Sequence, residues 1–267
     1  MSERIPLEIE GLTKTFATAA GPVFAVQDVN AQILDGEFAC ILGHSGCGKS
    51  TVLSIIAGLQ HATQGRIVID GVEADGPGTD RGVVFQAPCL LPWLTVRENV
   101  ALAVKQATPD LTRAERQAQV DRYLEMVGVA DAADQLPGEL SLGTQQCVSL
   151  ARALSVDPRF LLLDEPFSML DSLTRFELQD ILLHIWEQDR KIVVMVTHDV
   201  NEALYLADRL ILMTDGPAAR VGEILSVPFP RPRERVAVLE HPQYYAFHGQ
   251  VIDFLEHHAQ QSVALTG

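Results

Sequence analysis

Eight residues near the N-terminus have the types and the spacing that bind a phosphate. Residues 43–50 read GHSGCGKS and match the pattern G-x-x-x-x-G-K-[ST]. Glycines let backbone N–H groups turn toward phosphate oxygens, and a following helix adds the positive end of its dipole. The apolar run FACIL precedes the loop and the helical pattern KSTVLSIIAGL follows it, which is the required strand–loop–helix order. We therefore expect a nucleotide phosphate site.

The roles of the loop residues follow from their side chains. Lys49 would reach the β- and γ-phosphates, the Ser50 hydroxyl would bind Mg²⁺, and Thr51 would contact the α-phosphate. His44 and Cys47 occupy variable positions and receive no catalytic role. The expected nucleotide-binding residues of this segment are Gly43, His44, Ser45, Gly46, Cys47, Gly48, Lys49, Ser50 and Thr51.

Three further polar groups follow apolar strand patterns. Asp164 and Glu165 end the run FLLLDE, where ligands of open α/β sheets bind; Asp164 would hold Mg²⁺, and Glu165 would deprotonate the attacking water. A helix cap or a surface acid is the alternative reading. His198 follows IVVMVT and could contact a γ-phosphate or order water, although a lone histidine is more often structural. Gln86 follows VVF, and its amide could touch both Mg²⁺ and water.

The four cysteines form no C-x-x-C pair, which makes a zinc site or a disulfide framework improbable and fits a reducing cytoplasm. Cys40, inside a strand pattern, is expected to be a small buried residue. Cys47 lies near an expected helix N-terminus, where a thiolate is stabilised. Our hypothesis is that alkylation of Cys47 blocks nucleotide binding sterically.

The elements that must position these residues alternate along the chain, which favours an α/β fold with a largely parallel sheet. Helical spacing appears at Val120, Tyr123, Leu124 and Val127, and again over 178–186. Between about residues 87 and 143 helical pattern dominates, which indicates an inserted helical subdomain. After Pro228 a Pro/Arg stretch is typical of a linker, and a short amphipathic helix is expected from Phe247 to Leu255. The expected strands are Phe38–Leu42, Ile67–Ile69, Val83–Phe85, Phe160–Leu163, Ile192–Val196 and Leu210–Met213.

Composition limits the partners. The 267 residues are 47% hydrophobic and 21% charged, which is ordinary for a globular protein. The net charge of −15 repels nucleic-acid backbones, so we expect no nucleic-acid partner. The N-terminus is charged where a signal peptide would be apolar, and the charge-free stretch 82–96 is too short and too broken by prolines to span a bilayer.

The order of these motifs resembles the ATP-binding subunits of ABC transporters from about Leu7 to Val227. After the phosphate loop and Gln86 come LSLGTQQ at 140–146, Asp164-Glu165, SMLD at 168–171 and His198. The resemblance implies a P-loop NTPase (RecA-like) core with a parallel sheet, N-terminal antiparallel strands and an inserted helical subdomain. It divides the chain into a core (1–86 and 146–227), a helical signature subdomain (87–145) and a C-terminal linker with a short helix (228–267).

The resemblance also implies a head-to-tail homodimer that holds each ATP between the phosphate loop of one subunit and the signature segment of the other. Ser141 and the backbone of Gly143 would donate to the γ-phosphate, Asp171 would couple the two sites, and Phe16 would stack on adenine. The signature departs from the family pattern, since Leu142 replaces a glycine, Thr144 replaces Met or Gln, and Cys147 replaces an arginine. These departures bear on turnover more than on nucleotide binding.

The segment CLLPWL after Gln86 and the tail FPRPRERV resemble the nitrate/sulfonate/taurine importer subgroup. The expected function is ATP hydrolysis that drives a membrane permease, at the cytoplasmic face of the inner membrane, for a small anion delivered by a solute-binding protein. The alternative is a regulatory nucleotide-binding subunit with little turnover. A chromosome, repair or translation ATPase is disfavoured because only one phosphate loop is present and residues 86–140 leave no room for a coiled coil. A GTPase is disfavoured because no N-K-x-D motif is present.

Overall fold

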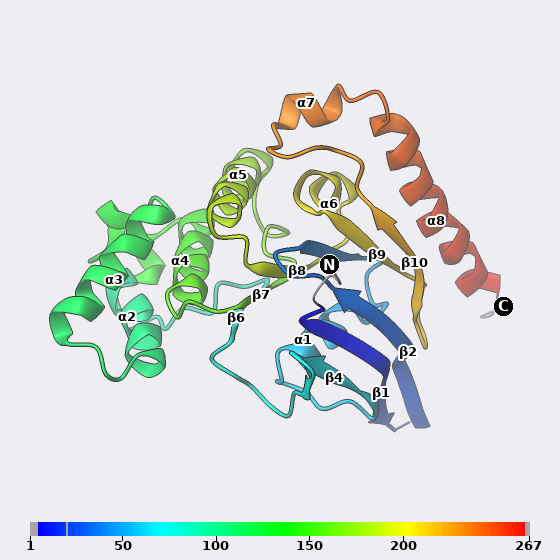
Figure 1. Cartoon of the computed structure of the whole chain (residues 1–267), viewed down its shortest axis with the longest axis horizontal. Helices are drawn as coiled ribbons and strands as arrows, with labels where there is room; N and C mark the ends of the chain where they lie inside the picture. Colours follow the sequence, from blue (N-terminus) through cyan, green and yellow to red (C-terminus); the bar gives the residue numbers. More distant parts are fainter. Residues whose placement is uncertain (1–4, 20, 265–267) are drawn as a thin grey trace. The chain divides into compact units, whose positions relative to one another are not determined.

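The computed structural model describes residues 5–19 and 21–264, which form two compact units. The first unit takes in the described residues up to Pro77 and from Ile192 onward, and the second runs from Gly78 to Lys191. The expected core, helical subdomain and C-terminal division of the chain stays a prediction. The helices and strands of both units follow the chain from blue to red in Figure 1.

The N-terminal part of the first unit is an antiparallel sheet, which confirms the expected N-terminal strands. Strand β1 lies between β2 and β4, and β4 pairs with the short β5. One face of β1 supplies Leu7 and Ile9 to the core, as alternation along a half-buried strand requires. The bounds are β1 Leu7–Thr18, β2 Gly21–Ile33, β4 Gln64–Ile69 and β5 Val72–Glu73.

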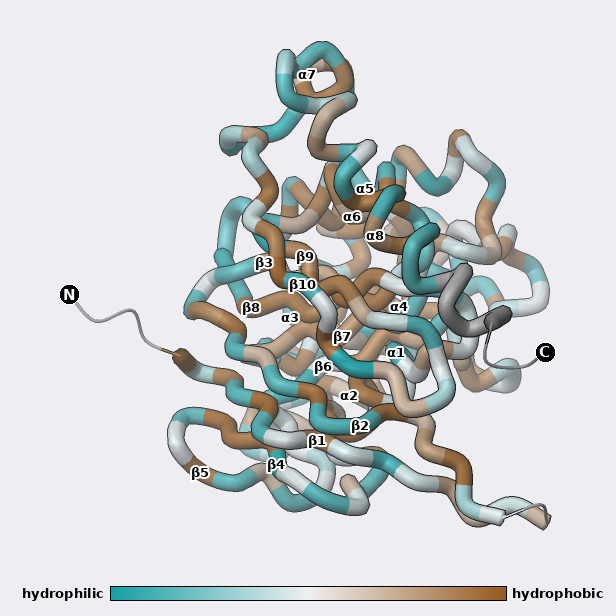
Figure 2. Tube along the Cα trace, turned by 90° about the vertical axis from the view of Figure 1, so that its right-hand side faces the viewer, coloured by the Kyte–Doolittle hydropathy of each residue, from teal (hydrophilic) through white to brown (hydrophobic). Residues whose placement is uncertain are grey.

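The second sheet of this unit is mostly parallel. Strand β3 pairs in parallel with β8 on one side and β9 on the other, and β10 pairs antiparallel with β9. Every residue of β3 and β8 is buried, which explains why their sequences are almost entirely apolar, and Figure 2 shows them in brown. The bounds are β3 Phe38–Leu42, α1 Lys49–Ile56, β8 Ile192–Thr197, α6 Val200–Leu206, β9 Arg209–Met213 and β10 Val221–Ser226.

The second unit combines two parallel strands, β6 and β7, with four helices. Thr95 and Thr112 begin α2 and α3 with capping boxes closed by Glu98 and Glu115. Val120 and Leu124 are buried, as their helical spacing predicts. The bounds are β6 Arg81–Val84, α2 Val96–Ala107, α3 Arg113–Met126, α4 Leu142–Leu154, β7 Phe160–Asp164 and α5 Ser172–Asp189, with single 3₁₀ turns at Ala130–Ala132 and Pro137–Glu139.

The C-terminal part of the first unit is more helical than the sequence suggests. After α7 (Arg235–Leu239), helix α8 runs over Tyr244–Ala264, far beyond the short helix expected at 247–255. Val251 and Leu255 are buried, so the amphipathic pattern identified the packed face correctly. Among the described helices none is both long and apolar enough to cross a bilayer.

Two arginines attach the Pro/Arg stretch to the rest of the first unit, although its composition is typical of a linker. Arg233 is 6% exposed, and its guanidinium donates to the main-chain oxygens of Phe229, Leu204, Tyr205 and Ala207. Three of these oxygens belong to the last turn of α6 and the residue after it, where helix carbonyls lack intrahelical partners. Arg231 pairs with the Asp208 carboxylate at 2.9 Å.

Candidate nucleotide-binding and catalytic site

The phosphate loop lies in the first unit between β3 and α1, as the sequence predicts. Gly48 precedes α1 with a φ of 92°, a left-handed conformation that favours glycine. A Cβ atom at Gly48 would lie 2.5 Å from Val26 Cγ1 and 3.0 Å from the main-chain oxygen of Ala25. The loop therefore needs glycine at this position both for its backbone angle and for space.

The side chain of Lys49 lies inside the loop. Its Nζ donates to the main-chain oxygens of Gly43 at 2.8 Å and His44 at 2.9 Å, and the residue is only 3% exposed. Ser50 and Thr51 follow in the first turn of α1. The ammonium thus holds the start of the loop against the start of the helix, which places a positive charge at the centre of the expected phosphate site.

The structure contradicts the expectation of a stabilised Cys47 thiolate. Cys47 is 1% exposed, and burial raises the pKa of its thiol, an effect that Lys49 only partly opposes. The helix N-terminus does not compensate for the loss of solvent around the charge. Cys40 is fully buried, as expected for a small strand residue.

Thiol reactivity should therefore be concentrated at Cys89, the one exposed cysteine of the four, all of which are described. Burial raises the pKa of Cys147 to about 11, which keeps that thiol protonated at neutral pH. We expect one thiol to react rapidly with a disulfide reagent in the folded protein, and all four in denaturant. Cys89→Ser should abolish the rapid phase. A rapid phase that survives Cys89→Ser and disappears in Cys47→Ser would contradict this prediction.

Asp215 is a contact of the phosphate loop that sequence reasoning missed. His44 Nδ1 lies 2.8 Å from Asp215 Oδ1, so the loop between β9 and β10 is tied to the phosphate loop. A hollow of about 400 Å³ beside this pair is lined by both residues together with Phe24. No pattern signals the contact, because 171 positions separate the two residues.

Phe16, the expected adenine-stacking residue, lies on β1 opposite Val23 of β2. It is 41% exposed, which leaves part of its ring open to a ligand. Lys14 Nζ lies 5.1 Å from the ring centroid, within cation–π range. The aromatic face is therefore accessible and carries a neighbouring positive charge.

His198 lies at the same sheet edge as the start of the phosphate loop. Strands β3 and β8 are parallel neighbours and pair Leu42 with Thr197, so Gly43 and His198 each follow a paired residue directly. His198 is exposed, and the next residue, Asp199, caps α6 by accepting from the Glu202 N–H at 3.1 Å. The carboxyl ends of parallel strands are where ligands bind in open α/β sheets.

The second unit repeats this arrangement with the other catalytic candidates. Strands β6 and β7 pair Val84 with Leu163, so Gln86 and Glu165 each lie two residues beyond a paired position. Asp164 is the last residue of β7. The sequence predicts this edge because a polar group follows each apolar strand pattern.

The signature segment begins α4. Ser141 is its N-cap and accepts from the Thr144 N–H at 3.1 Å, and the hydroxyls of the two residues lie 2.8 Å apart. A Cβ atom at Gly143 would lie 2.3 Å from Thr174 Cγ2, so a side chain at this glycine would have to displace the Thr174 methyl group. The substituted position, Leu142, is half-buried in the first helical turn, and Cys147 is 6% exposed in the core.

Asp171 begins α5 as its N-cap. Its carboxylate accepts from the Thr174 hydroxyl at 2.7 Å and from the N–H groups of Leu173 and Thr174. The hydrogen bonds from Thr174 lower the pKa of Asp171, so the carboxylate stays charged. Thr174 therefore donates to Asp171 with its hydroxyl and places its methyl group against Gly143. Sequence reasoning missed this link between the two residues.

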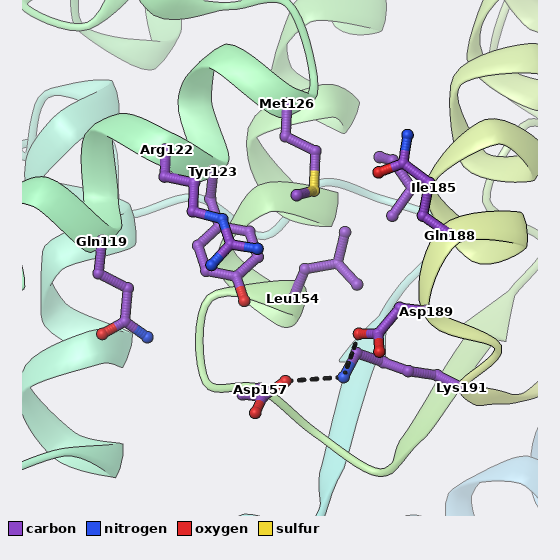
Figure 3. A pocket seen from close by; sticks show the side chains of 10 residues that line it. All are labelled: Gln119, Arg122, Tyr123, Met126, Leu154, Asp157, Ile185, Gln188, Asp189 and Lys191. Atoms are coloured by element: carbon purple, nitrogen blue, oxygen red, sulfur yellow. Dashed lines mark hydrogen bonds and ion pairs between the residues drawn. The ribbon is translucent and has the colours of Figure 1, made fainter.

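A second hollow, of about 500 Å³, lies in the second unit away from these groups (Figure 3). Its Lys191 pairs with Asp157 at 2.7 Å and Asp189 at 2.8 Å. These residues lie near the C-terminal ends of α4 and α5, about 25 Å along α5 from Asp171. Because Lys191 is paired with two carboxylates, we assign this hollow no part in catalysis.

The predicted site residues divide between the two units. Phe16, the phosphate loop and His198 belong to the first unit. The second unit contains the remaining candidates, which are Gln86, Ser141, Gly143, Asp164, Glu165 and Asp171.

The strand–loop–helix phosphate segment on a parallel sheet is the defining feature of a P-loop nucleotide-binding fold. Residues 26–168 match the family model described as ABC transporter, and the chain belongs to this family. It is 51% identical to the nitrate import ATP-binding protein NrtD of Synechococcus elongatus over 93% of this chain and 91% of that protein.

The bicarbonate transport ATP-binding protein CmpD of the same species is 48% identical over 93% of this chain and 90% of that protein. A solved dimeric structure of the ATP-binding cassette MJ0796, bound to ADP and Pi in a post-hydrolysis state, superposes with a TM-score of 0.74. It is 34% identical and covers 84% of this chain and all of that one. The expected family and the α/β P-loop fold with parallel strands are thereby confirmed.

Proposed function

We propose that this chain is the ATP-hydrolysing subunit of an ABC importer for a small anion. The observation that carries the proposal is the same in both units: candidate catalytic groups follow paired parallel strands at matched positions. Gly43 is matched with His198, and Gln86 with Glu165. The similarity to proteins named for nitrate and bicarbonate import supports a small anion as cargo.

In the first unit the loop would hold the triphosphate. Lys49, already surrounded by main-chain oxygens of the loop, would exchange them for β- and γ-phosphate oxygens. His198 would donate a hydrogen bond to the γ-phosphate, and Phe16 would stack on the adenine. His44 and Asp215 would keep the loop in place.

In the second unit Glu165 would accept a proton from the attacking water. Gln86 and Asp164 of this unit would bind Mg²⁺, as would Ser50 of the phosphate loop in the first unit, because hydroxyl, amide and carboxylate oxygens are the donors that this ion prefers. Such sites use one or two protein carboxylates together with substrate phosphates, so a cluster of three acidic or histidine ligands is not needed. The bound ion would neutralise charge that develops on the phosphates.

The second subunit of a head-to-tail homodimer would complete the site. Ser141 and the N–H groups at the start of α4 would point at the γ-phosphate of the partner, with the positive end of the helix dipole behind them. The dimeric cassette similar to this chain supports such an assembly. Gly143 remains at the position where a side chain would clash, and no observation favours the regulatory, low-turnover alternative.

The loop after Gln86 would receive a permease at the cytoplasmic face of the inner membrane. Asn99, 1% exposed, accepts from the Leu91 N–H at 2.8 Å and donates to the main-chain oxygens of Leu91, Leu94 and Thr95. Arg152 donates to those of Pro88 and Cys89. These bonds hold the loop rigidly while Trp93 is 69% exposed, as expected of a docking side chain.

The proposal is tested by co-expression with the membrane subunit, followed by ATPase assays with solute-binding protein and candidate anions. We expect the two chains to co-purify and one small anion to stimulate hydrolysis. Trp93→Ala should weaken co-purification at least tenfold and keep the basal ATPase rate. Tyr245→Ala, which removes an aromatic side chain 81% exposed in the other unit, should leave both co-purification and the basal rate unchanged. Hydrolysis without any permease association would overturn the transport assignment.

A further inference from the structure

We propose that Ser168 is a positioning residue for ATP hydrolysis, acting on Gln86 and Glu165 together. The inference rests on the proposed function, since it concerns the same reaction. Ser168 opens the SMLD segment in the turn between β7 and α5, a segment in which the sequence analysis gives a role only to Asp171. Its hydroxyl links the residues that follow β6 and β7.

The hydroxyl makes two hydrogen bonds. Ser168 Oγ donates to the main-chain oxygen of Glu165 at 2.9 Å and accepts from Gln86 Nε2 at 3.1 Å. The Ser168 N–H also donates to the same Glu165 oxygen at 3.2 Å. Ser168 thus contacts the main-chain oxygen of Glu165, the candidate base, and the side-chain amide of Gln86, a candidate metal ligand.

The first consequence concerns which way the Gln86 amide points. A serine hydroxyl has a single hydrogen, and here that hydrogen is directed at the Glu165 carbonyl. Only a donor can then satisfy the hydroxyl oxygen from the other side, so Gln86 must present its NH₂ group to Ser168. Its Oε1 is consequently the amide atom available to bind a metal ion or to accept from water, as the proposed chemistry requires.

The second consequence concerns the backbone of Glu165. Its φ is 44°, a left-handed conformation that a residue with a side chain adopts only when its surroundings hold it there. The two hydrogen bonds from Ser168 hold the carbonyl group of this strained residue. Loss of the hydroxyl would therefore loosen both the amide of Gln86 and the turn that aims the Glu165 carboxylate.

The test is a double-mutant cycle on the full chain with MgATP. Ser168→Ala should lower kcat about tenfold and change the KM for ATP by less than about twofold, because the phosphate loop is untouched. It should also raise the Mg²⁺ concentration needed for half-maximal activity. Ser168→Thr, which keeps the hydroxyl, should recover most of kcat, and Ser226→Ala, at an exposed serine on β10, should resemble the wild type.

In a Gln86→Ala background, Ser168→Ala should lower kcat by less than about threefold further, because the two residues act as a unit. If the fold-loss of kcat in the double variant equals the product of the fold-losses in the two single variants, Ser168 does not act through Gln86. An unchanged kcat in Ser168→Ala would overturn the proposal altogether.

A second measurement does not depend on hydrolysis. The side-chain amide NMR signals of Gln86, assigned by their loss in Gln86→Ala, should shift in Ser168→Ala and stay in place in Ser226→Ala. Unmoved signals in Ser168→Ala would overturn the contact even in an active enzyme. A wild-type chain without ATPase activity would instead overturn the proposed function, while these signals would still report on Ser168.

Discussion

Glu165→Gln should lower the steady-state rate of ATP hydrolysis by about 10²- to 10³-fold, because an amide cannot accept the proton of the attacking water. Glutamine has nearly the same shape, so the turn held by Ser168 should persist and ATP should still bind. With the reaction blocked, the ATP-bound form should accumulate as a dimer. Light scattering behind size-exclusion chromatography, with and without MgATP, measures this directly.

Glu125→Gln is the matched control, since it makes the same change at an exposed position on α3. It should hydrolyse ATP at the wild-type rate. If Glu165→Gln hydrolyses ATP as fast as Glu125→Gln, Glu165 is not the base. If it stays monomeric with saturating MgATP and with the permease supplied, the sandwich of two subunits around ATP is wrong.

Arg233→Ala should destabilise the folded protein by about 3 kcal/mol or more, because several buried main-chain oxygens lose their donor at once. Denaturant unfolding followed by circular dichroism would measure the change. Arg233→Lys should recover part of the loss, since an ammonium keeps the charge but cannot span the same oxygens.

Arg220→Ala is the matched control for charge, because Arg220 is exposed in the same unit. Its effect should stay within about 0.5 kcal/mol, as at most surface positions. A small effect of Arg233→Ala, equal to that of Arg220→Ala, would mean that the segment after Pro228 behaves as the flexible linker its composition suggests.

Much of the fold followed from local pattern. The buried strands β3, β7 and β8 were predictable because their sequences are almost entirely apolar. The phosphate loop was predictable because its glycines have a fixed spacing. Helix α8 was underestimated. Past Leu255 the apolar residues are few and mostly small (Ala259, Val263 and Ala264), so the amphipathic pattern weakens before the helix ends.

A site residue could be predicted where the same short segment contains both the reactive side chain and the strand that positions it, as with Lys49 after β3 and Glu165 after β7. Contacts between distant segments left no pattern, which is why the contacts of Asp215 with His44, of Ser168 with Gln86 and of Thr174 with the Gly143 position were missed. Cys47 shows the opposite failure, because proximity to a helix N-terminus was visible in the sequence while its burial was not.

The order of the phosphate loop around Lys49 affects how the free energy of ATP binding is used. The His44–Asp215 contact braces the loop before a ligand arrives, so the loop has less conformational freedom to lose when Lys49 exchanges its main-chain oxygens for phosphate oxygens. Binding to an already ordered receptor costs less entropy than binding to a loose one. A larger share of the free energy of ATP binding then remains available to bring the two subunits of the dimer together.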